Sequence, residues 1–161
     1  MKRSFFIWIS FVVIALMAVS CNTENVFSPS IRFSSVLYRT SAEGVKDTIT
    51  FSDSLHIGDT VYLPMILDGY YDYLISFTAQ ADSDKVKVSF PCDDEFRKYL
   101  ASSSDLEHGK MVFLPDQVYA CYVTFAYVPV KSGTHRIDFL LESSARDPYS
   151  EWSGHFEIGV K

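Results

Sequence analysis

The sequence predicts an all-β domain made of two antiparallel sheets packed face to face, with one short helix. From residue 31 onward, short apolar segments recur with Gly, Asp and Ser between them, as strands and turns require. Aromatic residues, mostly Phe and Tyr, form 16% of the 161 residues, and such side chains suit pleated, half-buried surfaces. Each segment has one apolar face, as in Ile137, Phe139 and Leu141. Two sheets packed against each other would bury all of these faces.

Nine strands are expected on this basis, joined by turns such as "HIGD", "LDGY", "ADSD" and "VKSGT". Pro64 lies within one of them and has no N–H to donate to a ladder, which predicts an edge position or a bulge there. The expected strands cover residues 31–38, 47–51, 60–67, 71–80, 85–90, 110–114, 118–128, 135–143 and 154–160.

One segment has a helical period instead. In "DDEFRKYL", residues 93–100, Asp93 can cap a helix whose first turn is acidic, and Phe96, Tyr99 and Leu100 recur at helical spacing. We expect a short helix that crosses the sandwich between two strands.

The charge balance excludes one class of partner. The chain carries 14 Lys and Arg against 20 Asp and Glu, a formal net charge of −6, and no basic cluster offsets it. A nucleic-acid backbone would be repelled, so no nucleic-acid partner is expected. The length of residues 31–161 fits a single domain.

The first 20 residues have the pattern of a secretory signal. Lys2 and Arg3 precede an apolar run from Phe5 to Val19 that carries no charge. This run is shorter than the roughly 20 residues that a helix needs to cross a bilayer. A signal peptide is therefore favoured over a permanent transmembrane anchor.

The end of that run, Ala18-Val19-Ser20-Cys21, resembles the lipobox of bacterial lipoprotein signal peptides. The resemblance implies that the Cys21 thiol is joined to a diacylglycerol and that the chain is cut before it. Residues 1–20 would then be the signal peptide, and residues 21–30 the lipidated N-terminus and a polar tether. The expected location is the outer membrane, on its periplasmic or surface-exposed face. The alternative is an ordinary signal peptide in which Cys21 has no such role.

The last 45 residues carry a second resemblance. Strand "YVTFAYVPV", turn "KSGT", strand "HRIDFLLES" and the final "GHFEIGV" look like the closing strands of immunoglobulin-like sandwich domains. With the lipobox, the chain resembles small lipoproteins with immunoglobulin-like domains found in Bacteroides and its relatives. This implies an immunoglobulin-like antiparallel β-sandwich over residues 31–161. The alternative fold is a closed β-barrel of the lipocalin or calycin type, which would enclose a ligand cavity.

Two cysteines remain in the mature chain, Cys92 and Cys121, and the strand alternation points both toward the core. They allow one disulfide, but free cysteine is also a common buried residue. No CxxC motif or Cys/His cluster is present, and the four histidines are scattered singly. We therefore expect no metal site and no cofactor.

None of the common catalytic motifs occurs in the sequence, so we expect a protein that is not an enzyme. The more informative residues are aromatic ones in polar turns. Tyr70 lies in "DGYYDYL", and Tyr149 and Trp152 lie in "DPYSEWSGHF". Rings flanked by polar groups suit contacts with proteins or glycans. The alternative for Trp152 is a lid folded back on the core.

These observations predict a membrane-anchored extracytoplasmic lipoprotein whose domain is a non-catalytic binding or assembly module of the cell envelope. Its expected partners are the membrane, through the lipid anchor, and a protein or glycan at the cell surface. Two alternatives stay open: a hydrolase acting on the cell envelope or on glycans, and a barrel that binds a small apolar ligand.

Overall fold

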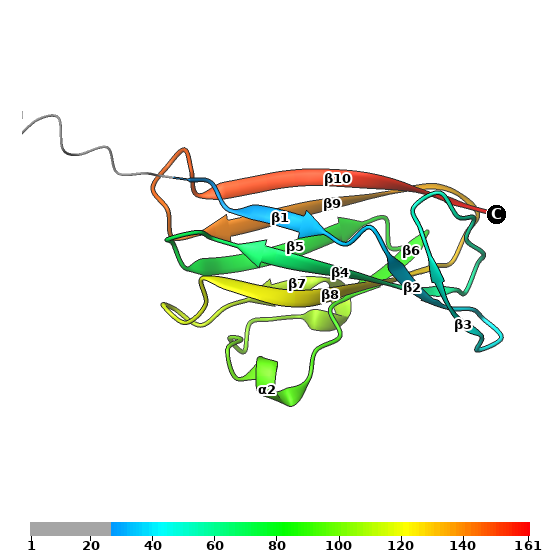
Figure 1. The fold of residues 1–161 in the computed structure, drawn as a ribbon, viewed down its shortest axis with the longest axis horizontal. Helices are drawn as coiled ribbons and strands as arrows, with labels where there is room; N and C mark the ends of the chain where they lie inside the picture. The colour runs from blue at the N-terminus through cyan, green and yellow to red at the C-terminus, as the bar shows by residue number, and fades with distance from the viewer. Residues whose placement is uncertain (1–26) are drawn as a thin grey trace, which may run out of the picture.

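The structure is a computed structural model that describes residues 27–161, and it consists of two antiparallel sheets (Figure 1). One sheet has the order β3-β2-β4-β8-β6, with β1 also paired to β4, and the other has the order β10-β9-β5-β7. The elements are β1 (Ser30–Phe33), β2 (Leu37–Thr40), β3 (Lys46–Ile49), β4 (Thr60–Asp68), β5 (Leu74–Ala81), β6 (Val86–Ser89), α2 (Asp94–Arg97), a 3-10 turn (Leu106–His108), β7 (Lys110–Val112), β8 (Ala120–Pro129), β9 (Gly133–Ser143) and β10 (Glu151–Val160).

The order of the strands is that of an immunoglobulin-like sandwich. If β1 and β2 are counted as one interrupted strand, then β1/β2, β4, β8 and β6 occupy the places of strands A, B, E and D. Strands β5, β9 and β10 occupy those of C, F and G, with β7 added beside β5. The predicted fold is therefore confirmed.

The core lies between the two sheets and is filled by side chains. The rings of Phe77 and Phe139 stack with centroids 5.7 Å apart, and Phe125 meets Phe139 edge-on at 5.2 Å. Val61 and Leu63 of β4 are fully buried on the same face. Because two separate sheets pack on each other here, the closed-barrel alternative is wrong.

The segment expected as one strand over residues 31–38 forms two. Strand β1 pairs with Met65–Asp68 of β4, and β2 pairs with its first three residues, Thr60–Tyr62. The interruption lies opposite the middle of β4, where Ser34 donates its N–H to the Pro64 carbonyl at 3.0 Å. The two halves of the expected strand therefore pair with different parts of β4, on either side of this interruption.

Pro64 lies in a central strand, so the expected edge position is wrong, and the irregularity expected as the alternative lies in the neighbouring chain between β1 and β2. On one side β4 is paired with β8, with Pro64 opposite Thr124. On its other side β4 faces the interruption between β1 and β2, toward which the Pro64 carbonyl points. Since the N–H and C=O of one residue point to the same side of a strand, the missing donor of Pro64 falls in that interruption.

The expected helix is confirmed, although it is short. Asp93 accepts a hydrogen bond from the Phe96 backbone N–H at 2.8 Å and so caps α2 (Asp94–Arg97). The helix lies in the connection from β6 to β7, which passes from one sheet to the other, and it projects from the side of the sandwich (Figure 1).

The predicted signal peptide, Cys21 and the first part of the tether lie outside the described residues. No helix among residues 27–161 is long and apolar enough to cross a membrane. The lipid anchor therefore stays a prediction from the sequence.

Candidate contact surfaces

The outer face of the larger sheet is apolar at its centre. Tyr38 and Tyr62 are opposite one another on β2 and β4, and Ile66 of β4 is opposite Tyr122 of β8. Tyr122 is 64% exposed and Tyr38 is 53% exposed. We call this surface the tyrosine face. It comprises Tyr38, Tyr62, Pro64, Ile66, Tyr122, Thr124, Ala126 and Val128, of which Pro64 and Ala126 are themselves buried.

Charged side chains lie at the border of the tyrosine face and not at its centre. Arg32 and Asp68 form an ion pair of 3.5 Å toward one end of the strands. Lys46 of β3 and Lys87 of β6 lie toward the other end, on the two edge strands. A charge-depleted, tyrosine-rich centre with a polar border is the composition found at protein interfaces.

A groove adjoins the tyrosine face next to α2. Its volume is about 250 Å³, and Tyr122 and Thr124 of β8 form one wall while Pro91, Cys92 and Phe96 form another. Grooves of this kind can take an anchoring side chain of a partner, which is where interface energy concentrates.

The sequence indicates this surface through a strand that is apolar on both faces, although alternation does not say which face is the core. The strand "TVYLPMIL" buries Val61 and Leu63, but the opposite parity carries Tyr62, Pro64 and Ile66, which are apolar too. A strand that is apolar on both faces is typical of a sheet covered on both sides. In this chain only one side is covered by the second sheet, so the other side faces outward.

A second aromatic surface lies at one end of the sandwich. The β4–β5, β7–β8 and β9–β10 loops meet there, together with the start of the described chain (Figure 1). We call it the aromatic end, and it comprises Phe27, Tyr70, Tyr71, Tyr73, Tyr119 and Tyr149.

Backbone hydrogen bonds and ring contacts join these loops. The Gly69 N–H donates to the Tyr119 carbonyl at 2.8 Å, and the Ser144 N–H donates to the Tyr73 carbonyl at 2.8 Å. The rings of Tyr73 and Tyr119 stack with centroids 4.0 Å apart. The end is thus one connected surface although its residues come from distant parts of the chain.

Two of the predicted contact residues are exposed at the aromatic end. Tyr70 is 46% exposed and Tyr149 is 41% exposed. Tyr70 has a φ of 58°, a left-handed conformation that is rare for a residue with a large side chain, and Asp68 accepts its N–H at 2.8 Å. Tyr71, the first residue of the strand predicted over residues 71–80, is 75% exposed. Its strand begins only at Leu74, so alternation does not apply to it.

Trp152 lies in a strand and not in the polar loop expected for it. Strand β10 begins at Glu151, and Trp152 is paired with Leu141 of β9 on the half-buried side of the strand. Its ring packs against Phe33 with centroids 6.3 Å apart and lies over Gly154. This position corresponds to the lid alternative more closely than to an exposed contact.

Both predicted core cysteines are free thiols in the structure, so the disulfide that the sequence allowed is not formed. Cys121 lies opposite Leu67 near the start of β8, while Cys92 follows the end of β6. Burial raises the pKa of the Cys121 thiol to about 12, which keeps it protonated and unreactive at neutral pH.

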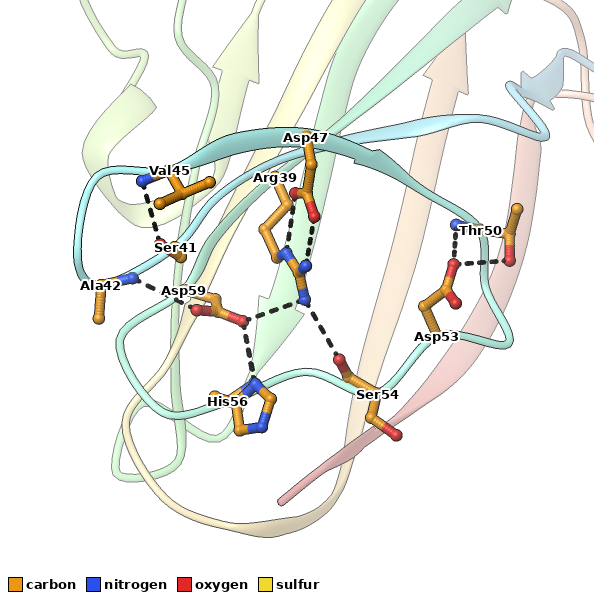
Figure 2. A network of polar contacts seen from close by, with 10 residues as sticks. All are labelled: Arg39, Ser41, Ala42, Val45, Asp47, Thr50, Asp53, Ser54, His56 and Asp59. Carbon is orange, nitrogen blue, oxygen red and sulfur yellow. Dashed lines mark hydrogen bonds and ion pairs between the residues drawn. The ribbon is translucent and has the colours of Figure 1, made fainter.

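The opposite end of the sandwich is held by charged side chains (Figure 2). Arg39 binds the Asp47 carboxylate through two nitrogens and donates to the Ser54 carbonyl at 3.4 Å. Asp59, only 2% exposed, lies 3.7 Å from Arg39 and accepts the His56 backbone N–H at 3.0 Å. We call this end the charged end, and it comprises Arg39, Ala42, Asp47, Thr50, Asp53, Ser54, His56 and Asp59.

Hydrogen bonds at the charged end lower the pKa values of two carboxyl groups. The hydrogen bond from Arg39 lowers the pKa of the Asp47 carboxyl, and hydrogen bonds from Thr50 lower that of Asp53.

Among residues 27–161, no group of three or more His, Cys, Asp or Glu side chains is arranged to hold a metal ion.

No protein-family model and no curated protein matches the chain. Among solved structures, the SafD adhesin of Salmonella superposes with a TM-score of 0.42 at 11% identity, over 83% of this chain and 99% of the adhesin. A family 123 glycoside hydrolase from Clostridium perfringens, described as acting on glycolipid glycans, superposes with a TM-score of 0.43 at 10% identity. That match covers 83% of this chain but only 27% of the hydrolase. Similarities at this level carry no information about activity.

Proposed function

We propose that the protein is an extracytoplasmic lipoprotein of the outer membrane, tethered through Cys21, whose sandwich is a non-catalytic binding or assembly module for another protein. The observation that supports the module is the tyrosine face, a sheet surface with two exposed tyrosines, Tyr38 and Tyr122, and charges only at its border. The sequence pattern from Lys2 to Cys21 supports the anchor.

A protein partner suits the tyrosine face better than a glycan does. Sugars are held by converging hydrogen-bond donors and acceptors around a ring. Between its tyrosines this face carries the half-buried Ile66 and Thr124, together with the buried Pro64 and Ala126. Flat apolar surfaces with tyrosines match the cores of protein interfaces, and the adjoining groove by α2 gives a place for an anchoring side chain.

Photo-crosslinking in intact cells tests the docking surface. A photo-reactive phenylalanine analogue in place of Tyr122 should give a discrete adduct, because this ring is 64% exposed and lines the groove by α2. The matched control is the same analogue at Val45, which is 61% exposed in the β2–β3 turn. Equal labelling at both positions, or none at Tyr122, would reject the face. A dimer-sized adduct would identify the partner as a second copy of the chain.

Fractionation tests the anchor separately. Cys21→Ser should leave an unprocessed or soluble protein, because the thiol that carries the lipid is gone. If the processed variant still fractionates with membranes as the parent does, Cys21 is not the anchor.

The hydrolase alternative has one observation in its favour. Glu142 of β9 and Glu151 of β10 are directly opposite on the outer face of the smaller sheet, and Glu142 accepts a hydrogen bond from the Ser76 hydroxyl. Paired carboxylates are what glycoside hydrolysis needs, but these lie on a sheet face and not in an enclosing cleft. Glu142→Gln and Glu151→Gln should leave any hydrolytic activity of the purified protein unchanged. A loss of hydrolytic activity in both variants would support the hydrolase alternative.

A further inference from the structure

The aromatic end is also the end at which the chain enters the sandwich. The described chain begins at this end of the sandwich (Figure 1). Phe27, the first described residue, has its ring centroid 5.4 Å from that of Tyr70 and 6.3 Å from that of Tyr71. The described chain therefore begins among these rings.

The length of the preceding chain limits how far this end can be from a membrane. Six residue steps separate Cys21 from Phe27, and at about 3.3–3.6 Å per residue they span at most roughly 20 Å. The sandwich is longer than that, because β9 alone has 11 residues and extends about 36 Å at 3.3 Å each. If Cys21 carries the anchor, as the proposed function holds, the aromatic end is the end near the bilayer.

The side chains at this end suit the interface between lipid and water. Tyr71 is 75% exposed, Tyr119 is 45% exposed, and Phe27 at 45% adds a wholly apolar ring. Tyrosine combines an apolar ring with a polar hydroxyl and is enriched at the headgroup level of membranes for that reason.

Charge does not provide the attraction. Asp72, Asp116 and Asp147 lie in the same three loops, against one basic residue, Arg146. Acidic side chains therefore outnumber basic ones, and anionic lipid headgroups would not be attracted. A contact at this end must rest on the rings and on the short tether, and added salt should not weaken it.

We propose that the aromatic end docks on the interfacial region of the bilayer that holds the lipid anchor. The proposal rests on the proposed function, because it needs the anchor at Cys21. Docking by this end makes the sandwich stand upright on the membrane, with the charged end pointing away. The tyrosine face then runs along the side of the upright domain, where a neighbouring protein in the same membrane can reach it.

Fluorescence quenching by brominated lipids tests this orientation. The full lipidated protein would be placed in phosphatidylcholine vesicles with and without brominated acyl chains, in two variants. Tyr71→Trp puts the probe at the aromatic end, and Phe51→Trp is the matched control, since Phe51 is 54% exposed in the β3–β4 loop at the opposite end. The emission of Trp152 is measured in the parent and subtracted.

The added emission of Tyr71→Trp should fall by roughly half in brominated vesicles, because interfacial rings lie beside the acyl chains. That of Phe51→Trp should not change. Tyr149→Trp repeats the measurement from another loop and should follow Tyr71→Trp. Equal quenching at the two ends, or no quenching at the aromatic end, would overturn the proposal.

The two proposals fail in different ways. If the parent does not co-sediment with vesicles, the anchor itself is absent and both fail. If the parent co-sediments and Tyr71→Trp is not quenched, only the docking fails, and the exposed rings at this end are then available to a protein or glycan.

Discussion

At the charged end of the sandwich, side chains bond to one another and to the loop backbone, whereas at the aromatic end the loops are joined mainly through their own N–H and C=O groups. Asp59 accepts N–H groups from Ala42 and His56, and without it these loops would lose their acceptor. Within residues 27–161, the side chains of Tyr70 and Tyr71 contact Phe27 through their rings and make no comparable hydrogen bond to the loop backbone. The carboxylate of Asp59 is occupied by the fold and is not available to a partner, whereas the rings of Tyr70 and Tyr71 are exposed and available.

The largest expected effect is at the charged end. Asp59→Ala should lower the free energy of unfolding by about 3 kcal/mol, since it removes a buried carboxylate that faces Arg39 and two backbone donors. Urea unfolding measures the change. The matched substitution at the other end, Tyr71→Ala, should change it by less than about 0.5 kcal/mol. Similar losses at both ends would remove the contrast between them.

Trp152 marks where the aromatic end stops and the core begins. Trp152→Ala should cost roughly 2–3 kcal/mol, at or below the usual range for large aromatic truncations, because the ring is half-buried against Phe33. Thermal unfolding and a partner-binding assay would be read together. A small change in melting temperature together with a loss of binding would show that Trp152 is a contact residue and not a lid on the core.

The backbone closure of the aromatic end can be tested with glycine. A Cβ added at Gly69 would lie 2.3 Å from the Asp72 carbonyl oxygen, so Gly69→Ala should force the β4–β5 loop to shift, at a cost of about 1–2 kcal/mol. At Gly159 nothing lies within 4 Å of an added Cβ, and Gly159→Ala is the control that should be neutral or slightly stabilising. Chemical denaturation compares the two, and a Gly69→Ala protein as stable as the control would contradict the tight packing.

The smallest effect is the acid response of the charged end. Because hydrogen bonding by Arg39 lowers the pKa of Asp47 in the folded protein, its contribution is fully present above the unfolded pKa of about 3.9 and is lost as the pH falls. The difference in stability between the parent and Asp47→Asn should therefore shrink from pH 6 to pH 3. Urea titrations at several pH values measure it. A difference that stays constant with pH would show that the ion pair is not coupled to folding.

The sequence by itself determined the class of the fold and its local signals. The alternation in Ile137, Phe139 and Leu141 identified a half-buried strand, and Asp93 capped the helix as expected, because both depend on neighbours within a few residues. The exposure of Tyr70 and Tyr149 followed from the turn residues around them for the same reason.

Only the tertiary structure decided where the surfaces lie. Strand β4 is apolar on both parities, and which one becomes the core depends on the second sheet, which arrives from later in the chain. Trp152 lies in a strand because it pairs with Leu141 of β9. The loops of the aromatic end meet because one hairpin loop, β9–β10, and two loops that cross between the sheets, β4–β5 and β7–β8, lie at the same end of the sandwich. These outcomes rest on pairing between residues far apart in sequence, whereas periodicity and turn chemistry report only on residues close together.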